Sequence, residues 1–331
     1  EVYHGIIMAG QVPELYAKTQ LASVDTLRSR CITREIIPWP TADVMVVDEA
    51  HHVGSKTYEK IFNKYDDKLI IGVTATPVRG NGKGLGDFFD HLIIGATVRE
   101  LMDAGFLAEA EYMVPAVPDM QGVKVARGDY VEEQLAKVMN QSKLMGCVTE
   151  HWKKYASDRQ TIAFAVNVAH SIAIRDNFIE AGVPAAHIDG RTPQEERDQI
   201  IADYRAGKYK VLSNCQVFTE GVDMPEVGAV ILARPTKSLA LYLQMAGRGL
   251  RPKDDGPSCT ILDHAGNRYR HGAVDEDHYW TLDNRTIQEV DREKKADTEE
   301  KILKEFVCEN CGHIFSKQAV CPKCGTPLGT H

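Results

Sequence analysis

The chain has 331 residues, of which 43% are hydrophobic and 26% are charged, and its formal net charge at pH 7 is −8. This length suits about two ordinary domains, and the composition is typical of globular protein rather than of disordered chain. No run is long and apolar enough to span a bilayer, and the N-terminus lacks the regions of a secretory signal. The acidic balance excludes attraction to nucleic acid by a global positive field, so any such contact has to be local. We therefore expect a cytoplasmic protein with no membrane partner.

The chain begins at Glu1 rather than at methionine, and a strand-like segment, GIIMAG, follows almost at once. We therefore expect the sequence to be a fragment or a processed product. Short apolar runs rich in β-branched residues then recur between helix-like stretches. These runs are VMVVDE, LIIGVT, TIAFAV, KVLSNC and AVILARP. Strands that are apolar on both faces and alternate with helices predict a parallel sheet covered by helices, which is an α/β fold.

The predicted strands form two groups, one before about residue 105 and one after about residue 160, which indicates two lobes. A connection rich in proline and glycine joins them, and a polar, charged stretch with the character of an exposed helix or linker follows the second group. The predicted divisions are a first lobe at 1–107, a connection and second lobe at 108–272, a charged linker or helix at 273–304 and a C-terminal module at 305–331.

One helix of the second group can be predicted in detail. Thr192 is expected as its N-cap, Pro193 as its first helical residue and Glu195 as the partner in a capping box. Gly207 is expected to end it, and KVLSNC is the strand that it feeds.

Two adjacent carboxylates, Asp48 and Glu49, directly follow the apolar run VMVV. In an open parallel sheet the carboxyl ends of the strands face the ligand crevice. An aspartate there can hold Mg²⁺ through its water shell, and a neighbouring glutamate can orient or deprotonate an attacking water. The next apolar run, LIIGV, also ends in polar residues, Thr74 and Thr76. The pattern favours a site for phosphoryl transfer, and its plain alternative is a strand that ends in a solvated turn.

These residues resemble motifs II and III of superfamily 2 helicases, with D-E-A-H at 48–51 and T-A-T at 74–76. The second group of strands carries further motifs in the family's order. TIAFAVNVAHS resembles motif IV, VFTEGVDMPEV resembles motif V, and QMAGRGLRP matches the motif VI pattern Q-x-x-G-R-x-x-R. TATPVRGNGKGLGDFFD and ILDHAGN are similar to DEAH-type DNA helicases close to the RadD repair group and to the motor subunits of type I and type III restriction enzymes. The resemblance covers nearly the whole chain.

The resemblance implies two RecA-like parallel-sheet lobes, the first of them incomplete here, with ATP bound between them and hydrolysis driving movement on DNA. Its catalytic residues would be Asp48, Glu49, His51, Gln244, Arg248 and Arg251. Its residues for Mg²⁺ and ATP would be Asp48, Glu49, Gly221, Asp223, Arg248 and Arg251. Its residues for coupling or nucleic-acid contact would be Thr26, Thr74, Thr76 and Thr219. RNA is the less expected substrate.

The two arginines of motif VI also have a physical argument in their favour. A guanidinium is always charged and can donate to two phosphate oxygens at once, which suits it to stabilise charge in phosphoryl transfer. The alternative for Arg248 and Arg251, taken alone, is a solvated helix face.

One element of the family pattern, the phosphate-binding loop G-x-x-x-x-G-K-[ST], does not occur in residues 1–331. GNGKGLG at 80–86 is not such a loop, because Lys83 is followed by Gly84 and the segment comes after motif III. KTQLASVDTLRSR at 18–30 resembles the motif Ib region, so the missing part should be the first third or more of the first lobe. We expect this chain alone to hydrolyse ATP feebly.

Four of the eight cysteines cluster in CENCGHIFSKQAVCPKCG, near the C-terminus. Two C-x-x-C pairs, each followed by glycine, can place four thiolates around Zn²⁺. The predicted ligands are Cys308, Cys311, Cys321 and Cys324. A module of this size cannot build its own core, so it would need the metal to fold. A rubredoxin-like iron site and unliganded thiols are the alternatives, and the ribbon could contact DNA or a protein partner.

The sequence thus predicts an ATP-dependent DNA helicase or translocase with a C-terminal zinc ribbon, in DNA repair or in phage or restriction DNA processing. The alternative from another class is a catalytically silent DNA-binding or scaffold module that lacks the phosphate loop. A restriction-complex motor is a further alternative, which a nuclease domain or methyltransferase partner would distinguish.

Overall fold

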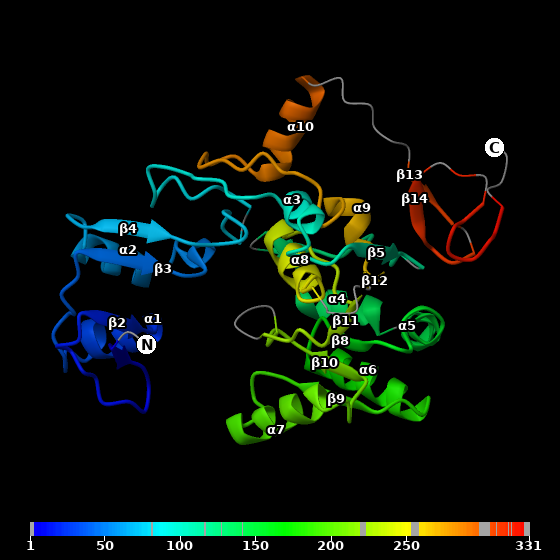
Figure 1. Cartoon of the computed structure of the whole chain (residues 1–331), viewed down its shortest axis with the longest axis horizontal. Helices are drawn as coiled ribbons and strands as arrows, with labels where there is room; N and C mark the ends of the chain where they lie inside the picture. Colours follow the sequence, from blue (N-terminus) through cyan, green and yellow to red (C-terminus); the bar gives the residue numbers. More distant parts are fainter. Residues whose placement is uncertain are drawn as a thin grey trace. The chain divides into compact units, whose positions relative to one another are not determined.

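The computed structural model describes residues 3–80, 82–115, 117–126, 128–140, 142–218, 223–252, 258–297, 305–308, 310–316, 318 and 320–327. The chain divides into two compact units, which we call unit 1 and unit 2 (Figure 1). Unit 1 comprises Glu1–Arg79, Lys83–Leu92 and Trp280–Asn284, and unit 2 comprises Gly80–Gly82, Ile93–Tyr279 and Arg285–His331.

Unit 1 contains two pairs of parallel strands. The first pair is β1 (His4–Ile7) with β2 (Thr19–Ala22), and the second is β3 (Val44–Val47) with β4 (Leu69–Gly72). Its helical segments are α1 (Val24–Leu27), the π-helix η1 (Arg28–Thr33), the 3₁₀ turn η2 (Ala50–His52) and α2 (Lys56–Lys64). The helix α2 is amphipathic and buries Ile61 and Phe62 against the inner side of β3, in a core that also holds Val47.

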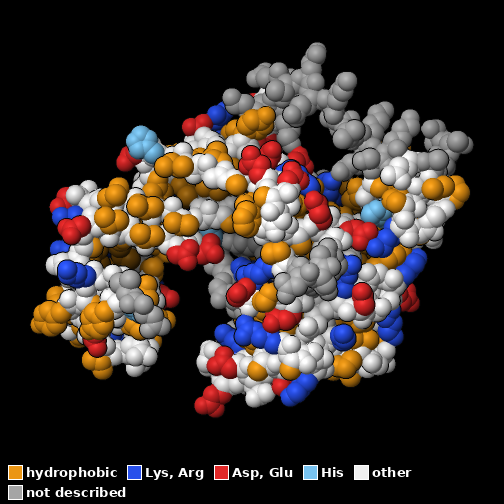
Figure 2. All heavy atoms as spheres, viewed as in Figure 1, with side chains coloured by type: hydrophobic (Ala, Val, Ile, Leu, Met, Phe, Trp, Pro, Cys, Tyr) orange, Lys and Arg blue, Asp and Glu red, His pale blue; other side chains and the backbone are white. Residues whose placement is uncertain are grey.

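The opposite face of the β3–β4 pair is apolar and exposed. Val44 pairs with Leu69 and Val46 pairs with Ile71, so alternate residues of both strands lie on this face. The exposed fractions of these four side chains run from 42% for Ile71 to 63% for Val46. Hydrophobic side chains accordingly gather on the surface over β3 and β4 (Figure 2).

Unit 2 is built on a six-stranded sheet in which all neighbouring strands are parallel. In spatial order the strands are β5 (Ala110–Met113), β12 (Cys259–Asp263), β11 (Val227–Leu232), β8 (Gln160–Phe164), β10 (Val211–Asn214) and β9 (Ala185–Ile188). Every residue of β10, β11 and β12 is buried, as expected for strands covered on both faces. The predicted α/β class is confirmed.

Helices flank this sheet. They are α3 (Val98–Asp103), α4 (Glu132–Met139), α5 (Ser142–Tyr155), α6 (Val168–Glu180), α7 (Gln194–Arg205), α8 (Leu239–Gly247), α9 (Asn267–His271) and α10 (Ile287–Asp297). The helix α6 packs on β8, β9 and β10, α8 packs on β11, and α5 packs on β12 and α6. Two short antiparallel hairpins complete the unit, β6 (Val125–Ala126) with β7 (Asp129–Tyr130) and β13 (Glu305–Val307) with β14 (Ile314–Ser316). Among the described residues, no helix combines the length and apolar character needed to cross a membrane.

Candidate functional site

The motif II carboxylates lie directly beyond the end of β3. Backbone hydrogen bonds from Val73 N–H to Val47 C=O (2.8 Å) and from Ala50 N–H to Val73 C=O (3.0 Å) hold this end against β4. Asp48 is exposed and Glu49 is half-buried. Glu49 also has a left-handed backbone, with φ 48° and ψ 48°, which is uncommon for a residue with a Cβ. The strand therefore delivers both carboxylates to the surface at its carboxyl end.

A hydrogen-bonded chain links motif II to motif III within unit 1. Nδ1 of the buried His51 lies 3.0 Å from Oγ1 of Thr74 and 3.3 Å from Oε2 of Glu49. The Thr74 hydroxyl accepts from the N–H of Thr76 (3.1 Å) and donates to its C=O (3.2 Å). The structure thus brings together four of the predicted site residues, and the imidazole lies between the acidic residue and the T-A-T turn.

Thr26 occupies a local structural position in unit 1. It lies buried in α1, where its N–H donates to Oγ of the N-cap residue Ser23 at 3.2 Å and its Oγ1 accepts from the Ser23 hydroxyl at 2.7 Å. These contacts stabilise the start of the helix.

Motif VI lies in unit 2, at and beyond the end of α8. The helix begins at the N-cap Ser238, whose Oγ accepts from Leu241 N–H at 3.3 Å. Gln244 and Arg248 stand four residues apart, so both point to the same side of the helix, and both are half-buried. The third residue, Arg251, is ion-paired with Asp223 of motif V at 2.8 Å. The predicted residues Thr219 and Gly221 lie outside the described residues.

Gly249, which separates the two motif VI arginines, occupies a sterically constrained position that the sequence did not predict. A Cβ built on it would lie 2.2 Å from Sγ of Cys259 and 2.8 Å from a methyl group of Val230. Glycine is therefore required for the arginine segment to lie directly on the sheet. The G-R-G sequence was the available signal, because a second glycine in a short arginine-containing turn indicates a close backbone approach.

The four C-terminal cysteines converge in unit 2. Their sulfur atoms all lie within 4.8 Å of one another, with 3.5 Å between Cys308 and Cys324 and 3.7 Å between Cys311 and Cys321. These separations exceed a disulfide bond, and they match the edge of about 3.8 Å expected for sulfur atoms about 2.3 Å from a tetrahedral zinc ion. The four thiols could therefore bind one metal ion.

The loops around these cysteines have the geometry of paired metal knuckles. Gly312 and Gly325 have φ of 70° and 72°, and their N–H groups donate to the C=O of Cys308 (2.7 Å) and Cys321 (2.9 Å). Hydrogen bonds from Thr326 lower the pKa of the Cys324 thiol to about 5, whereas burial raises the pKa of the Cys311 thiol.

The cysteine module is docked on the first strand of the unit 2 sheet. Val114 N–H donates to Gly312 C=O at 2.8 Å, and Nζ of Lys323 lies 2.8 Å from a carboxylate oxygen of Glu111. His313 lies 3.3 Å through Nδ1 from the C=O of Tyr112, and its ring stacks on that of Phe315. Three of the cysteines are buried in the same apolar cluster as the helix α5.

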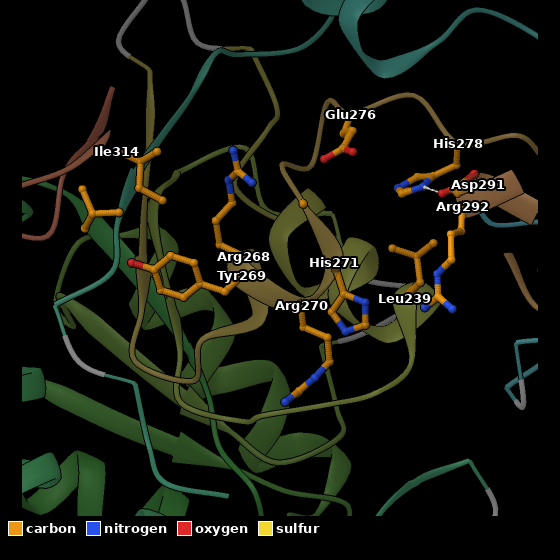
Figure 3. A pocket seen from close by; sticks show the side chains of 12 residues that line it. Leu239, Arg268, Tyr269, Arg270, His271, Glu276, His278, Asp291, Arg292 and Ile314 are labelled. Carbon is orange, nitrogen blue, oxygen red and sulfur yellow. Dashed lines mark hydrogen bonds and ion pairs between the residues drawn. The ribbon is translucent and has the colours of Figure 1, made fainter. Parts of the chain in front are cut away.

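A cavity of about 570 Å³ lies elsewhere in unit 2 (Figure 3). It is lined by Leu239, Arg268, Tyr269, Arg270, His271, Gly272, Glu276, His278, Asp291, Arg292, Val307 and Ile314. Polar side chains that line the cavity contact one another or the backbone. His278 Nδ1 lies 2.7 Å from Asp291 Oδ2, and Arg270 Nη1 donates to the backbone C=O of Thr236 at 3.1 Å. None of the predicted site residues that the structure describes lines this cavity.

Several histidines of unit 2 are buried in neutral form. Burial lowers the pKa of His264 to about 3 and that of His170 to about 4. His264 directly follows β12, and neither of its ring nitrogens has a hydrogen-bond partner among the described residues. These side chains belong to the core of unit 2 and not to the carboxylate cluster of unit 1.

Two protein families match this chain. The type III restriction enzyme res subunit matches residues 17–79, which include motif II and motif III, and the helicase conserved C-terminal domain matches residues 141–253, which include motifs IV to VI. A 51.5 kDa protein of a Lactococcus phage (isolate 7-9) is 33% identical over 283 residues, which are 85% of this chain and 61% of that protein. IRC3 of Saccharomyces cerevisiae, named as an ATP-dependent helicase, is 32% identical over 256 residues, or 74% of this chain and 37% of its own length. The chain thus spans less than two thirds of either relative.

Solved structures share the fold. A fragment described as the HsdR subunit of a type I restriction enzyme from Vibrio vulnificus YJ016 aligns with a TM-score of 0.63 at 20% identity, over 82% of this chain and 51% of that one. The type ISP restriction-modification enzyme LlaBIII bound to DNA gives 0.53 at 17% identity, over 75% and 19% of the two chains. Saccharomyces cerevisiae Dbp5 bound to RNA gives 0.53 at 14% identity, over 82% and 69%.

The order of the motifs, the parallel sheets and these relatives agree with one another. The chain therefore carries a domain of the type III restriction enzyme res subunit and a helicase conserved C-terminal domain, and it is related to the superfamily 2 helicases.

Proposed function

We propose that this chain is part of an ATP-dependent helicase or translocase that acts on DNA in preference to RNA, in DNA repair or in phage or restriction DNA processing. The observation that carries the proposal is the link from Glu49 through His51 to Thr74, at 3.3 and 3.0 Å. A scaffold has no physical need for a buried imidazole between a strand-end carboxylate and the next strand's turn. A motor needs such a link, because hydrolysis has to move the protein.

The residues present fit roles in phosphoryl transfer. Asp48, exposed at the end of β3, would hold Mg²⁺, which supplies charge neutralisation at the phosphates when it is bound. Glu49 would accept the proton of the attacking water, and the contact with His51 would fix its carboxylate. Arg248 and Arg251 would supply positive charge to the phosphate oxygens, with Gln244 as a neighbouring polar contact.

In this proposal residues 1–107 belong to the first lobe and 108–272 to the connection and second lobe, while 273–304 link them to the ribbon at 305–331. Gly221 and Asp223 would contribute to the nucleotide site. Thr26, Thr76 and Thr219 would act in coupling or in contact with the nucleic-acid backbone, as the family resemblance implies.

The choice of DNA rests on the restriction-enzyme relatives. LlaBIII was solved bound to DNA, whereas Dbp5, with a similar score, was solved bound to RNA. The type III restriction family match over residues 17–79 favours the first of these. Backbone contacts alone distinguish the two poorly, so the substrate has to be tested by stimulation of ATPase activity with each.

We infer that the exposed apolar face of β3 and β4 is covered in the intact protein by chain that precedes Glu1 and carries the phosphate loop. The face presents Val44, Val46, Leu69 and Ile71, and an apolar face of this kind is usually buried in a parallel sheet. The phage relative matches over only 61% of its length, which leaves room for such a segment. Without the loop, residues 1–331 alone should hydrolyse ATP feebly.

We also propose that Cys308, Cys311, Cys321 and Cys324 hold Zn²⁺ in a structural site. Four thiolates leave no coordination position open for catalysis, so the metal would stabilise the ribbon rather than act on a substrate. A protein partner could bind the ribbon's outer side.

The decisive experiment uses the protein extended upstream of Glu1 to include the natural phosphate loop, with and without Glu49→Gln. We expect the substitution to abolish hydrolysis and to leave ATP binding intact, because only the proton acceptor is lost. Glu59→Gln, on an exposed position of α2, is the matched control and should keep full activity. Unchanged turnover in Glu49→Gln would contradict the assignment. A coding frame that starts close to Glu1, with no loop before it, would support the silent DNA-binding or scaffold alternative.

A further inference from the structure

The glycine-rich segment that resembles a phosphate loop has a different partner in the structure. Residues Lys83–Leu92 belong to unit 1, and so does the short segment Trp280–Asn284, although the chain on both sides of that segment belongs to unit 2. The chain therefore leaves unit 2 after Tyr279, contacts unit 1 over five residues and returns to unit 2 at Arg285.

Backbone hydrogen bonds join the two segments. The N–H of Gly84 donates to the C=O of Asp283 at 2.9 Å, and the N–H of Gly86 donates to the C=O of Leu282 at 2.9 Å. A Cβ on Gly84 would lie 2.4 Å from the oxygen of Asp283, and a Cβ on Gly86 would lie 2.4 Å from that of Leu282. Only glycine allows this approach. Because both amides are already used, they are not arranged to bind phosphate, in agreement with the sequence argument.

Side chains add polar and apolar contacts. Arg79 donates through Nη2 to Oδ1 of Asn284 at 2.7 Å and is ion-paired through Nη1 with Asp87 at 2.9 Å. Asn284 in turn donates through Nδ2 to Asp87 at 3.3 Å. The half-buried Leu282 packs against the apolar core of unit 1. Residues 280–284 are thus held by two backbone hydrogen bonds, by the apolar side chain of Leu282 and by the polar cluster of Arg79, Asp87 and Asn284.

We propose that residues 280–284 are a strap that fastens the chain beyond the unit 2 sheet back onto unit 1. The chain passes between the two units at residues 79–80, 82–83 and 92–93, and again on both sides of the strap, at 279–280 and 284–285. Release of the strap would detach residues 280–284 from Lys83–Leu92 of unit 1. Since Arg79 follows the Thr74–Thr76 turn closely in sequence, the strap is attached to the loop that continues from motif III. At its other end the strap is followed along the chain by α10.

The test measures strap release in the full 331-residue chain. Gly84→Ala places a methyl group against the Asp283 carbonyl, and Asn284→Ala removes the polar cluster from an exposed position. Gly80→Ala is the matched control in the same loop, because its Cβ would meet nothing within 4 Å. The readouts are chymotrypsin cleavage after Leu282 and hydrogen exchange of the amides at 84 and 86.

We expect cleavage and amide exchange to be about tenfold faster in Gly84→Ala and about threefold faster in Asn284→Ala than in the parent chain, with Gly80→Ala unchanged. Exchange at Val47, in the core of unit 1, shows whether each variant has folded. If Gly84→Ala does not fold, Asn284→Ala decides alone. Equal cleavage in the parent chain, Asn284→Ala and Gly80→Ala, or amides at 84 and 86 that exchange without protection in the parent chain, would overturn the strap.

Discussion

The carboxylate of Asp223 lies 2.8 Å from Nη1 of Arg251, so an acidic residue of motif V holds the last arginine of motif VI. We predict that Asp223→Asn lowers the ATPase rate of the loop-containing protein at least about tenfold, because Arg251 loses the partner that positions it. The Asp223 side chain is 76% exposed, so the free energy of unfolding should change by less than about 1 kcal/mol.

The measurement compares steady-state ATPase rates with thermal melting. Asp176→Asn is the control, because Asp176 forms a similar ion pair with Arg175 at 2.7 Å, outside the helicase motifs. A rate for Asp223→Asn equal to that of the control would argue against the positioning role of Asp223.

The backbone of Glu49 carries a conformational cost, which the role proposed for its carboxylate would explain. A left-handed φ of 48° costs a residue with a Cβ about 1 kcal/mol, and glycine avoids most of this cost. We predict that Glu49→Gly stabilises unit 1 by about 0.5 to 1 kcal/mol and abolishes hydrolysis in the loop-containing protein. Glu59→Gly, inside α2, should instead destabilise unit 1 by about 1 kcal/mol. Urea titration followed by hydrogen exchange of unit 1 peptides measures both, and destabilisation by Glu49→Gly would refute the prediction.

Removal of the metal should loosen the contact between the cysteine module and β5. We predict one zinc ion per chain, lost in Cys308→Ser or after treatment with a strong chelator. The amide of Val114, which donates to Gly312 C=O at 2.8 Å, should then exchange about tenfold faster. Cys147→Ser, outside the cluster, should keep both the zinc and the protection. Elemental analysis together with hydrogen exchange checks this, and it fails if Val114 is equally protected with and without metal.

The buried histidines predict the pH dependence of unit 2. The folded-state pKa of His264 is about 3 and that of His170 about 4, while both are near 6.5 in the unfolded chain. At pH values between the folded-state and unfolded-state pKa values, the unfolded state binds more protons than the folded state. The contribution of these histidines to the free energy of unfolding is therefore complete above pH 6.5 and falls as the pH drops toward 4. Each unit of pKa separation corresponds to about 1.4 kcal/mol.

We expect His264→Gln to flatten this dependence, because the side chain no longer titrates. His52→Gln, at an exposed position in unit 1, should leave the slope unchanged. Urea midpoints for unit 2 at pH 7, 6, 5 and 4 measure the effect. Equal slopes for the parent chain and His264→Gln would show that other groups cause the loss.

The strand β3, which ends directly before Asp48 and Glu49, could be predicted because an apolar run followed by two acidic residues is a local sequence signal. Its geometry could not be predicted. The left-handed turn at Glu49 and the position of His51 between Glu49 and Thr74 depend on hydrogen bonds to the neighbouring strand, which residue spacing does not specify. The sulfur cluster was predictable because four ligands in two short pairs leave few geometric choices.

The helix α7 shows the limit of local pattern reasoning. The predicted capping box is wrong: the N-cap is Pro193, without a side-chain cap bond, and Thr192 Oγ1 instead accepts from the N–H of Asp189 at 3.0 Å. Asp189 competes for the same threonine from the preceding turn. Gly207, with φ 75°, follows the end of the helix as expected.

The position of the cysteine module bears on the solubility of the protein. The strand β5 is an outer strand of the six-stranded sheet, and such a strand offers unpaired N–H and C=O groups to other chains. At the outer edge of β5, Met113 forms an antiparallel β-bridge with His313, and the N–H of Val114 donates a hydrogen bond to the C=O of Gly312. The module therefore covers this edge of the sheet, and on the zinc site proposed above, loss of the metal is expected to free the edge for pairing with other chains, so zinc starvation should promote aggregation before it affects the helicase motifs.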